Sequence, residues 1–242
     1  MNKNSKINIP KNKTKIICTI GPASNSEKII KSMILNGMNI ARLNSSHGLI
    51  QEHIENISKI HNISNDLGIN IPVLIDLPGA KIRIGKLKED PVTLCKDEIV
   101  TLTTKKIIGD KKTIPVEYKH LSKTVSKSST VYLSDGLIEL KVLNFDEKNV
   151  RCKVIIGGSL LSHKGINFTN SKIHVNSVTK KDLEIVEIGM MYGVNTFCIS
   201  YPKDERDIQK IKNFAKKQDK KIKVIAKIER SEAIENFDKI LE

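Results

Sequence analysis

The feature that most constrains this chain is an alternation of apolar runs and helical patterns that begins near residue 13. Strand-like runs and helical patterns follow one another at about 15–20, 24–37, 38–44, 49–66 and 71–76. Ser24, Asn25 or Ser26 marks the start of the first helix, and Gly37 and Gly68 mark helix ends. Alternation of this kind implies right-handed crossovers, so it predicts an α/β fold built on a parallel sheet.

The pattern changes between about residues 84 and 172. Runs there are short and rich in Val, Ile and Thr, with turn signals such as Gly157-Gly158, which predicts a small antiparallel domain inserted into the α/β unit. Alternation resumes with a capping box at Thr179 and Asp182, followed by a helix, strand, helix and strand at 180–192, 194–200, 203–217 and 222–229, and a helix after Ser231. We therefore expect three segments, at 1–83, 84–172 and 173–242.

Polar residues follow the second strand, in the sequence ARLNSSHG at 41–48. Side chains alternate along a strand, so Arg42, Asn44 and Ser46 are expected on one surface. The chain has 41 basic residues, yet Arg occurs only at 42, 83, 151, 206 and 230. Because most of the other basic positions hold Lys, these few arginines indicate sites that need a planar guanidinium able to form two parallel hydrogen bonds. Arg42 is a candidate for binding phosphate or carboxylate; alternatively, it closes the strand end by pairing with a local carboxylate.

The other strand ends are also polar, and they carry Thr19, Asp76, Ser200, and the pair Lys227 and Glu229. The carboxyl ends of parallel strands meet at one rim, where α/β folds build their sites. Cations and carboxylates gathered there suit phosphoryl transfer with a divalent metal. Lys227 and Glu229 are two residues apart and are expected on one face; the alternative is a plain surface ion pair.

Composition excludes several other classes of protein. No run approaches the roughly 20 apolar residues of a membrane span, and the Lys- and Asn-rich N-terminus lacks the apolar core of a secretory signal. Four widely spaced cysteines without a CxxC pair predict neither a zinc site nor disulfides: Cys18, Cys95, Cys152 and Cys198. The formal charge of +14 is spread along a chain with only 4% aromatic residues, so nucleic-acid binding is not expected. We expect a cytoplasmic protein with no membrane partner.

Ordered motifs along the chain resemble the pyruvate kinase family. They are KTKIICTIGPAS at 13–24, NIARLNSSHG at 39–48, DLPGAKIRIG at 76–85, GKLKEDPVTL at 85–94, SDGLIEL at 134–140, GG-L-SHKGIN around 157–167, and VIAKIER-EAIENFDKILE at the C-terminus. The resemblance implies a (β/α)8 TIM-type barrel interrupted after its third strand by a mobile β-rich lid. It also implies transfer of the phosphoryl group of phosphoenolpyruvate to ADP, which yields pyruvate and ATP.

The same resemblance implies roles for individual residues. Arg42 resembles the clamp for the phosphate of phosphoenolpyruvate, Lys227 the catalytic ammonium, and Glu229 the first carboxylate ligand of a substrate-side Mg²⁺ or Mn²⁺. The monovalent-cation pocket is matched by Asn44, Ser46 and Asp76. Positions that surround the nucleotide are matched by Thr19, Pro22, His47, Arg83, Lys164 and Asn167. Alternatively, His47 is a capping histidine and Lys164 a solvated lid lysine.

Two positions depart from the potassium-dependent members of the family. Those members usually carry Glu two residues before the Arg of the KIR-type motif and Thr directly after the Asp. Here the two positions hold Lys81 and Leu77. An ammonium at residue 81 can supply the charge that K⁺ otherwise provides, and Leu77 removes a hydroxyl ligand. We therefore predict a site that does not require K⁺.

The family continues with three more barrel strands and a C-terminal allosteric domain, whereas the pattern here stops at Glu242. Five strands leave two unpaired edges, which a C-terminal partner chain, a rearranged sheet or a second copy in a homo-oligomer would cover. We expect the isolated chain to be an incomplete (β/α)8 barrel, inactive alone. Three hypotheses stay open: an N-terminal portion of a pyruvate kinase, one half of a split enzyme, or a non-catalytic ligand-binding or interaction module. Retention of the site residues favours the first two.

Overall fold

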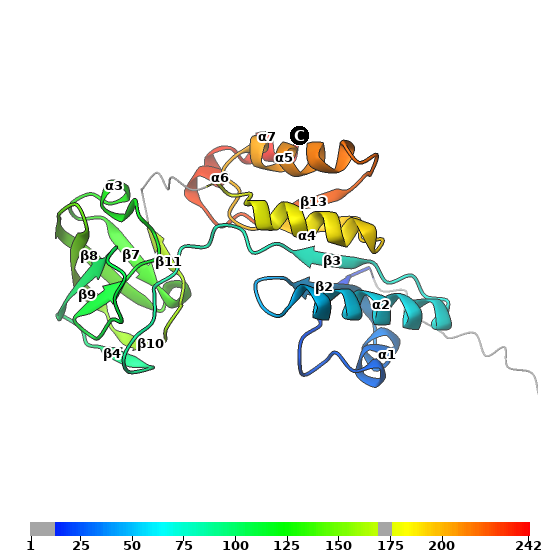
Figure 1. The fold of residues 1–242 in the computed structure, drawn as a ribbon, viewed down its shortest axis with the longest axis horizontal. Helices are drawn as coiled ribbons and strands as arrows, with labels where there is room; N and C mark the ends of the chain where they lie inside the picture. Colours follow the sequence, from blue (N-terminus) through cyan, green and yellow to red (C-terminus); the bar gives the residue numbers. More distant parts are fainter. Residues whose placement is uncertain (1–12, 169–175) are drawn as a thin grey trace, which may run out of the picture. The chain divides into compact units, whose positions relative to one another are not determined.

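The computed structural model of the chain describes residues 13–168 and 176–242 (Figure 1). The chain divides into two compact units: a sheet unit, Met1–Ala80 with Ser177–Glu242, and a β-rich unit, Lys81–Asn176. The boundary expected after residue 83 lies a few residues from this division. The boundary expected after residue 172, like the polar N-terminal residues 1–12, lies outside the described residues.

The sheet unit alternates strands and helices along the chain. Its elements are β1 (Ile16–Thr19), α1 (Glu27–Leu35), β2 (Met38–Asn44), α2 (Ile50–Leu67), β3 (Val73–Asp76), α4 (Lys180–Met191), β12 (Thr196–Ile199), α5 (Glu205–Lys216), β13 (Lys223–Ala226), α6 (Ser231–Glu235) and α7 (Phe237–Leu241). The five strands are all parallel, in the order β1-β2-β3-β12-β13. The predicted parallel sheet is therefore confirmed.

Local capping explains where several helices begin and end. The hydroxyl of Ser26 accepts a hydrogen bond from the backbone N–H of Ile29 at the start of α1. At α4, the Thr179 hydroxyl accepts from the Asp182 N–H, and the Asp182 carboxylate accepts from the Thr179 N–H at 2.7 Å, which is the predicted capping box. Gly68, with φ of +64°, ends α2 in the left-handed conformation that glycine adopts at low cost.

The helices that connect successive strands bury isoleucines against the sheet. Ile30 and Ile60 are completely buried in one core together with Phe197 of β12, and α1 packs against α2 as α4 packs against α5 (Figure 1). Gly189 lets α4 come close to the sheet, because a Cβ there would lie 2.8 Å from Ile75 Cδ1 and 2.9 Å from the Phe197 ring. This close packing fixes the strand ends from which the polar side chains project.

The structure differs from the sequence prediction at the two edge strands and at the C-terminal helix. β1 is more exposed than its apolar sequence suggests: Ile16 and Ile17 are 45% and 50% exposed, because β1 is an edge strand paired with β2 alone among the described strands. β13 ends at Ala226, three residues earlier than predicted. The helix after Ser231 is interrupted at Asn236, whose amide donates to the carbonyls of Lys203 and Glu232. Within residues 13–168 and 176–242, none of the helices has the length and hydropathy to cross a membrane.

The β-rich unit is built from short strands around its own core. Its elements are β4 (Val92–Leu94), β5 (Ile99–Thr103), β6 (Thr113–Pro115), α3 (Leu121–Thr124), β7 (Thr130–Leu133), the 3-10 helix η1 (Ser134–Gly136), β8 (Ile138–Phe145), β9 (Asn149–Ile156), β10 (Gly158–Leu160) and β11 (Ile166–Phe168). A six-stranded sheet has the order β11-β7-β8-β9-β5-β6, and β10 pairs with β4. All its neighbouring strands are antiparallel except β5 and β6, which are parallel.

Candidate functional site

Asp76, the last residue of β3, lies at the centre of a cluster of charged side chains in the sheet unit. Its side chain is only 4% exposed. The Arg42 guanidinium donates to Asp76 Oδ2 from Nε at 3.0 Å and from Nη2 at 2.5 Å. On the other side, Lys227 Nζ lies 3.1 Å from Oδ1. Two cations thus compensate one buried carboxylate, the condition under which a charge tolerates burial.

Arg42 is held by a third contact as well. Its Nη1 donates to the Thr19 hydroxyl at 2.7 Å, so side chains from β1 and β3 fix the guanidinium that β2 carries. The Arg42 side chain is still 30% exposed. The structure shows that Arg42 pairs with a local carboxylate and that its guanidinium stays partly accessible. Binding of an external anion by Arg42 stays a prediction. Thr19, assigned by resemblance to the nucleotide surroundings, contacts Arg42 in this structure.

Lys227 and Glu229 lie beyond the end of β13, not on a common strand face as expected. Their side chains still meet, with Lys227 Nζ 3.6 Å from Glu229 Oε1. The backbone N–H of Lys227 continues the ladder by donating to the Ile199 carbonyl at 3.1 Å. Because this ammonium lies between Asp76 and Glu229, the arrangement is more than an isolated surface pair. With Arg42 it gives two cations and two carboxylates in one network.

Sequence reasoning missed three residues that support this network. The Ser45 hydroxyl donates to the backbone carbonyl of Asp76 at 2.6 Å, and the Ser200 hydroxyl donates to the carbonyl of Leu77 at 2.7 Å. Tyr201 donates its backbone N–H to Glu229 Oε2 at 3.0 Å. Only Ser200 gave a signal in the sequence, as a polar residue after a strand. The role of Tyr201 depends on its backbone, which has φ of +55°.

A buried thiol lies next to the same carboxylate. Burial and, to a smaller extent, the Asp76 charge raise the pKa of Cys198 in β12 to about 11, against the opposing effect of the Lys227 and Arg42 charges. The thiol is therefore protonated near neutral pH, and it is no candidate for a nucleophile. It serves instead as a reporter of the charge on Asp76.

The remaining predicted residues of the sheet unit lie in exposed turns. Ser46 follows the end of β2, and its backbone N–H donates to Asn44 Oδ1 at 3.1 Å. Ser46 therefore does not share a strand face with Arg42 and Asn44, because the chain has already turned. His47 is exposed, and its carbonyl lies 2.9 Å from the His53 ring nitrogen Nε2. Pro22 is exposed in the turn after β1.

The β-rich unit gathers a second group of predicted residues around Asp135. Lys81 Nζ lies 2.8 Å from Asp135 Oδ1, and the hydrogen bond from Lys81 holds the pKa of Asp135 below its usual value, with further lowering by the charges of Lys164 and Arg83. Arg83 also donates to the carbonyl of His163 at 3.1 Å. Asn167 pairs with Tyr132 between β11 and β7. Lys81 thus has a carboxylate partner in its own unit, whereas Arg42 and Asp76 belong to the sheet unit.

Comparison with known proteins identifies the family. The family model "Pyruvate kinase, barrel domain" matches residues 11–242. The chain belongs to the pyruvate kinase family. The pyruvate kinase of Thermococcus litoralis is 47% identical over 96% of this chain, and that of Thermotoga maritima is 37% identical over 94%. A crystal structure of a pyruvate kinase from Cryptosporidium parvum superimposes with a TM-score of 0.85, at 29% identity and over 94% of this chain.

The chain spans about half the length of the pyruvate kinases that it matches. It covers 49% of the Thermococcus litoralis and Thermotoga maritima proteins and 48% of the Cryptosporidium parvum chain. Together with the parallel sheet, these matches identify the fold as α/β, part of a barrel of the pyruvate kinase type with an inserted β-rich unit. The matched portion contains Arg42, Asp76, Lys227 and Glu229.

Pyruvate kinases use a divalent metal, and Glu229 is the carboxylate here that suits one. Within the described parts of the chain, no three His, Cys, Asp or Glu side chains gather into a metal-binding group. Both oxygens of Asp76 are already engaged by Arg42 and Lys227. Both oxygens of Glu229 also have partners, in Lys227 and the Tyr201 N–H, but its side chain is 32% exposed against 4% for Asp76. One accessible carboxylate is compatible with Mg²⁺, which commonly keeps several waters and takes one or two carboxylates with substrate phosphate oxygens.

Proposed function

We propose that this chain carries the phosphoenolpyruvate side of a pyruvate kinase site, for the reaction of phosphoenolpyruvate and ADP to pyruvate and ATP in glycolysis. The observation that carries the proposal is the network of Arg42, Asp76, Lys227 and Glu229 at the carboxyl edge of the parallel sheet. A fixed guanidinium, an ammonium and a carboxylate on one edge match the demands of phosphoryl transfer, which depends on positioning and charge stabilisation.

Arg42 binds the phosphate of phosphoenolpyruvate in this proposal. Asp76 and Thr19 hold the guanidinium on two sides, so little side-chain freedom is lost when the anion binds. Its exposed part presents N–H donors in a planar fork that a phosphate accepts. The same Asp76 contact reduces the net charge of the pocket, which limits non-specific attraction of other anions.

Lys227 stabilises the charge that moves during the reaction. The bond between phosphorus and the enol oxygen breaks, and a bond to an oxygen of the ADP β-phosphate forms. The enol oxygen becomes an enolate oxygen, and a proton then reaches the adjacent carbon to give pyruvate. An ammonium held between Asp76 and Glu229 is oriented for the transferring phosphoryl group and the enolate oxygen. Mg²⁺ or Mn²⁺ held by Glu229 supplies further neutralisation of phosphate charge when it is bound.

For the nucleotide, we propose the candidate residues that the resemblance to the family gives, considered within each unit by itself. Thr19, Pro22 and His47 belong to the sheet unit, and Arg83, Lys164 and Asn167 to the β-rich unit. Basic residues dominate the second group, as expected for groups that meet the phosphates of ADP or ATP. We also propose a cytoplasmic location, on the basis of four widely spaced cysteines without a CxxC pair.

K⁺ independence is proposed on the basis of charge. In potassium-dependent relatives, Asn44, Ser46 and Asp76 correspond to the monovalent-cation pocket. In this chain Asp76 already pairs with Arg42 and Lys227, and Lys81 and Leu77 stand where potassium-dependent members usually carry Glu and Thr. We expect any turnover of the completed enzyme to be unchanged when K⁺ is replaced by a tetraalkylammonium ion. A requirement for K⁺ would overturn this part of the proposal.

Binding to the isolated chain tests the phosphoenolpyruvate site without requiring turnover. Titration with phosphoenolpyruvate and MnCl₂, followed by ³¹P NMR line broadening, should give saturable binding that Arg42→Gln weakens by at least about tenfold, because a charge-assisted fork is lost. Arg206→Gln is the matched control, since Arg206 also pairs with an aspartate, Asp204, but on α5. Equal effects of the two variants would exclude Arg42 as the phosphate clamp.

Turnover needs the residues that relatives carry outside the matched half, so we expect none from the chain alone. A lactate-dehydrogenase-coupled assay should detect pyruvate only after addition of the part of the Thermococcus litoralis protein that this chain does not match. Lys227→Met should then lower turnover by about 10²- to 10³-fold, because a charge-stabilising donor is removed, with folding unchanged. If the chain alone turned over at the rate of a whole pyruvate kinase, the expectation that it needs residues outside the matched half would be refuted. Binding without turnover in any combination would favour a non-catalytic ligand-binding module.

A further inference from the structure

Among the residues that the structure describes, one of the five arginines has a side chain without a hydrogen-bond or ion-pair partner. Four of them bind a carboxylate or a carbonyl: Arg42 with Asp76, Arg83 with the carbonyl of His163, Arg206 with Asp204, and Arg230 with Glu232. The side chain of Arg151 in β9 forms no hydrogen bond or ion pair with the residues that the structure describes. In a chain with 41 basic residues and so few arginines, an exposed, unpartnered fork at this position indicates an external anion.

Arg151 belongs to a row of polar residues that crosses four strands of the β-rich unit. The strand register places Thr113 of β6 opposite Thr101 of β5, Thr101 opposite Arg151, and Arg151 opposite Asn144 of β8. Adjacent strands lie roughly 4.8 Å apart, so the row extends over roughly 14 Å. The side chains of all four residues are at least partly exposed, and none has a partner within the described parts of the chain.

The next row along the same face is satisfied internally. Thr103 lies opposite Asn149 in the register, and its hydroxyl donates to Asn149 Oδ1 at 2.8 Å. Asn149 in turn donates to Asp146 at 3.0 Å, and hydrogen bonds from Asn149 and Lys148 lower the pKa of Asp146. The face thus has a closed row, whose side chains bond to one another, and an open row, whose side chains have no partner within the described residues. Only the open row offers hydroxyl, amide and guanidinium groups to a ligand.

This face of the sheet contains a groove with a volume of about 630 Å³. Besides the two rows, it is lined by Lys105, Ile107 and Phe145, and Phe145 is 45% exposed. The groove therefore combines one guanidinium, one ammonium, the Asp146 carboxylate, a line of donor and acceptor groups, and apolar surface. A simple anion would use only the two cations, whereas the open row matches a longer ligand with several hydroxyl groups.

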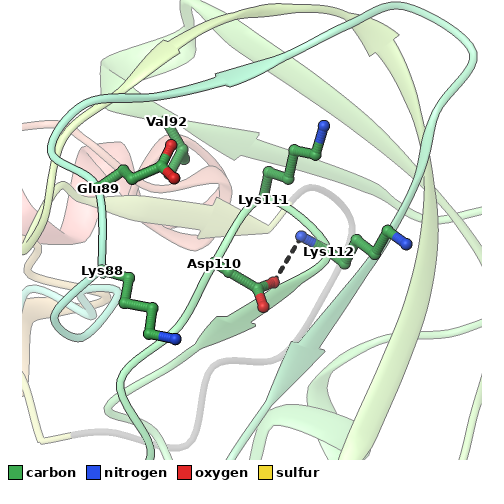
Figure 2. A pocket seen from close by; sticks show the side chains of 6 residues that line it. All are labelled: Lys88, Glu89, Val92, Asp110, Lys111 and Lys112. Atoms are coloured by element: carbon green, nitrogen blue, oxygen red, sulfur yellow. Dashed lines mark hydrogen bonds between the residues drawn. The ribbon is translucent and has the colours of Figure 1, made fainter.

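A second cavity of the β-rich unit lacks these properties. It has a volume of about 420 Å³ and is lined by Lys88, Glu89, Val92, Asp110, Lys111 and Lys112. Figure 2 shows the Asp110 carboxylate among these lysines, accepting a hydrogen bond from the backbone N–H of Lys112 at 2.8 Å. With three ammonium groups and two carboxylates, this cavity has the same formal net charge as the groove, but its lining has no guanidinium and no row of hydroxyl groups. This cavity provides a control for non-specific attraction by a chain of formal charge +14.

We propose that the groove over β6, β5, β9 and β8 binds a phosphate monoester of an open-chain polyol, with Arg151 and Asn144 on the phosphate and Thr101 and Thr113 on the hydroxyl groups. Lys105 contributes a second positive charge, and Ile107 and Phe145 provide apolar surface. This site is separate from the Asp76 network, and it stands whether or not the chain takes part in phosphoryl transfer. A six-carbon sugar-alcohol phosphate has the length to reach from the guanidinium along the row.

The experiment is a titration of the ¹⁵N-labelled chain with sorbitol 6-phosphate, followed by amide chemical shifts and by calorimetry. We expect saturable binding with a Kd below about 1 mM, with the largest shifts at residues 101, 113, 144 and 151. Arg151→Gln should weaken binding at least tenfold, and Arg151→Lys by less, because Lys keeps the charge without the fork. Lys112→Gln, which removes one positive charge from the cavity in Figure 2, should leave binding unchanged.

Further ligands and one double variant separate the two parts of the proposal. The double variant with Thr101→Val and Thr113→Val should weaken the binding of sorbitol 6-phosphate several-fold and leave the binding of inorganic phosphate unchanged. Sorbitol and gluconate should bind at least tenfold more weakly than the phosphate ester. Inorganic phosphate binding as tightly as the ester would overturn the role of the hydroxyl row. No binding at 10 mM, or equal losses in Arg151→Gln and Lys112→Gln, would overturn the site itself.

Discussion

The carboxyl edge of the parallel sheet and the groove of the β-rich unit each present an arginine, but in opposite states. At the sheet edge, Arg42, Asp76, Lys227 and Glu229 compensate one another around a carboxylate that is 4% exposed. In the groove, Arg151 and its row of hydroxyl and amide groups have no partners within the described residues. The first region is organised before a ligand arrives, and its contacts also stabilise the fold. The second contributes donors whose partners come from outside.

The largest effect that separates the two regions is expected from Asp76→Asn. The substitution keeps the shape but leaves Arg42 without a carboxylate partner and Lys227 with Glu229 alone. Loss of one partner of a buried ion pair costs about 3–5 kcal/mol, and we expect about 2–3 kcal/mol here because the two cations are themselves about one-third exposed. Arg151→Gln should change the free energy of unfolding by less than about 0.5 kcal/mol.

Urea denaturation of both variants, with hydrogen exchange assigned to the strands of each unit, measures this difference. Exchange should accelerate in β2, β3 and β12 of Asp76→Asn and stay unchanged in the β-rich unit. Equal losses of stability in Asp76→Asn and Arg151→Gln would show that the Asp76 network contributes no more to folding than an exposed arginine does.

The next effect uses one thiol in each unit as a reporter. Burial raises the pKa of Cys198 to about 11 and that of Cys152, next to Arg151, to about 12. A thiol whose pKa is raised by folding stabilises the protein below its ordinary pKa of about 9.0. This contribution is lost as the pH rises toward 11. In Asp76→Asn the Asp76 charge no longer raises the pKa of Cys198, so its alkylation by iodoacetamide at pH 9–10 should accelerate.

Mass spectrometry of the alkylated chain resolves the two thiols. Cys152 should keep its rate in Asp76→Asn. Ile57→Val is the matched control, because it weakens the same core by about 1 kcal/mol without touching Asp76. If Ile57→Val accelerates Cys198 as much as Asp76→Asn does, the effect comes from local unfolding and not from charge.

Several features of the sheet unit could be predicted because they are local. The apolar run of β2 ends where its polar residues begin, the capping box at Thr179 fixes the start of α4, and polar residues after each strand indicated the site edge. The positions of residues beyond the strand ends were harder to predict, because the alternation of side chains between the two faces stops where a strand ends. Ser46 follows a turn, and Lys227 meets Asp76 and Glu229 through loop geometry. Asn236 interrupts a helix through hydrogen bonds to the backbone, one of them to the carbonyl of Lys203. The spacing of apolar residues in the sequence gives no sign of this contact.

The groove of Arg151 could not be predicted for a different reason. Its four residues come from four strands, and their alignment depends on register. The register between β8 and β9 shifts between Val142 and Asn144, so spacing in the sequence does not place Asn144 opposite Arg151. The scarcity of arginine was visible in the sequence, but its meaning at residue 151 needed the three-dimensional arrangement.

The smallest effect is expected at the ion pair of Lys81 and Asp135, which lies between the two extremes. It has a direct partner, at 2.8 Å, but the Asp135 side chain is 69% exposed. Asp135→Asn should therefore lower the free energy of unfolding by less than about 1 kcal/mol at pH 7. Because Lys81 lowers the pKa of Asp135 in the folded chain, the pair stabilises the protein above the ordinary pKa of 3.8. That contribution disappears as the pH falls below this value.

Urea titrations at pH 7 and at pH 3 compare the chain with its Asp135→Asn variant. The difference should be small at pH 7 and smaller at pH 3, and 0.5 M NaCl should reduce it further because exposed charges are screened. Lys153 and Asp97 form a matched exposed pair at 2.7 Å in the same unit, so Asp97→Asn should behave alike. A loss at Asp135 as large as that at Asp76 would mean that Lys81 is held as tightly as Arg42. The contrast between a stabilising network at the sheet edge and weakly coupled charges in the β-rich unit would then fail.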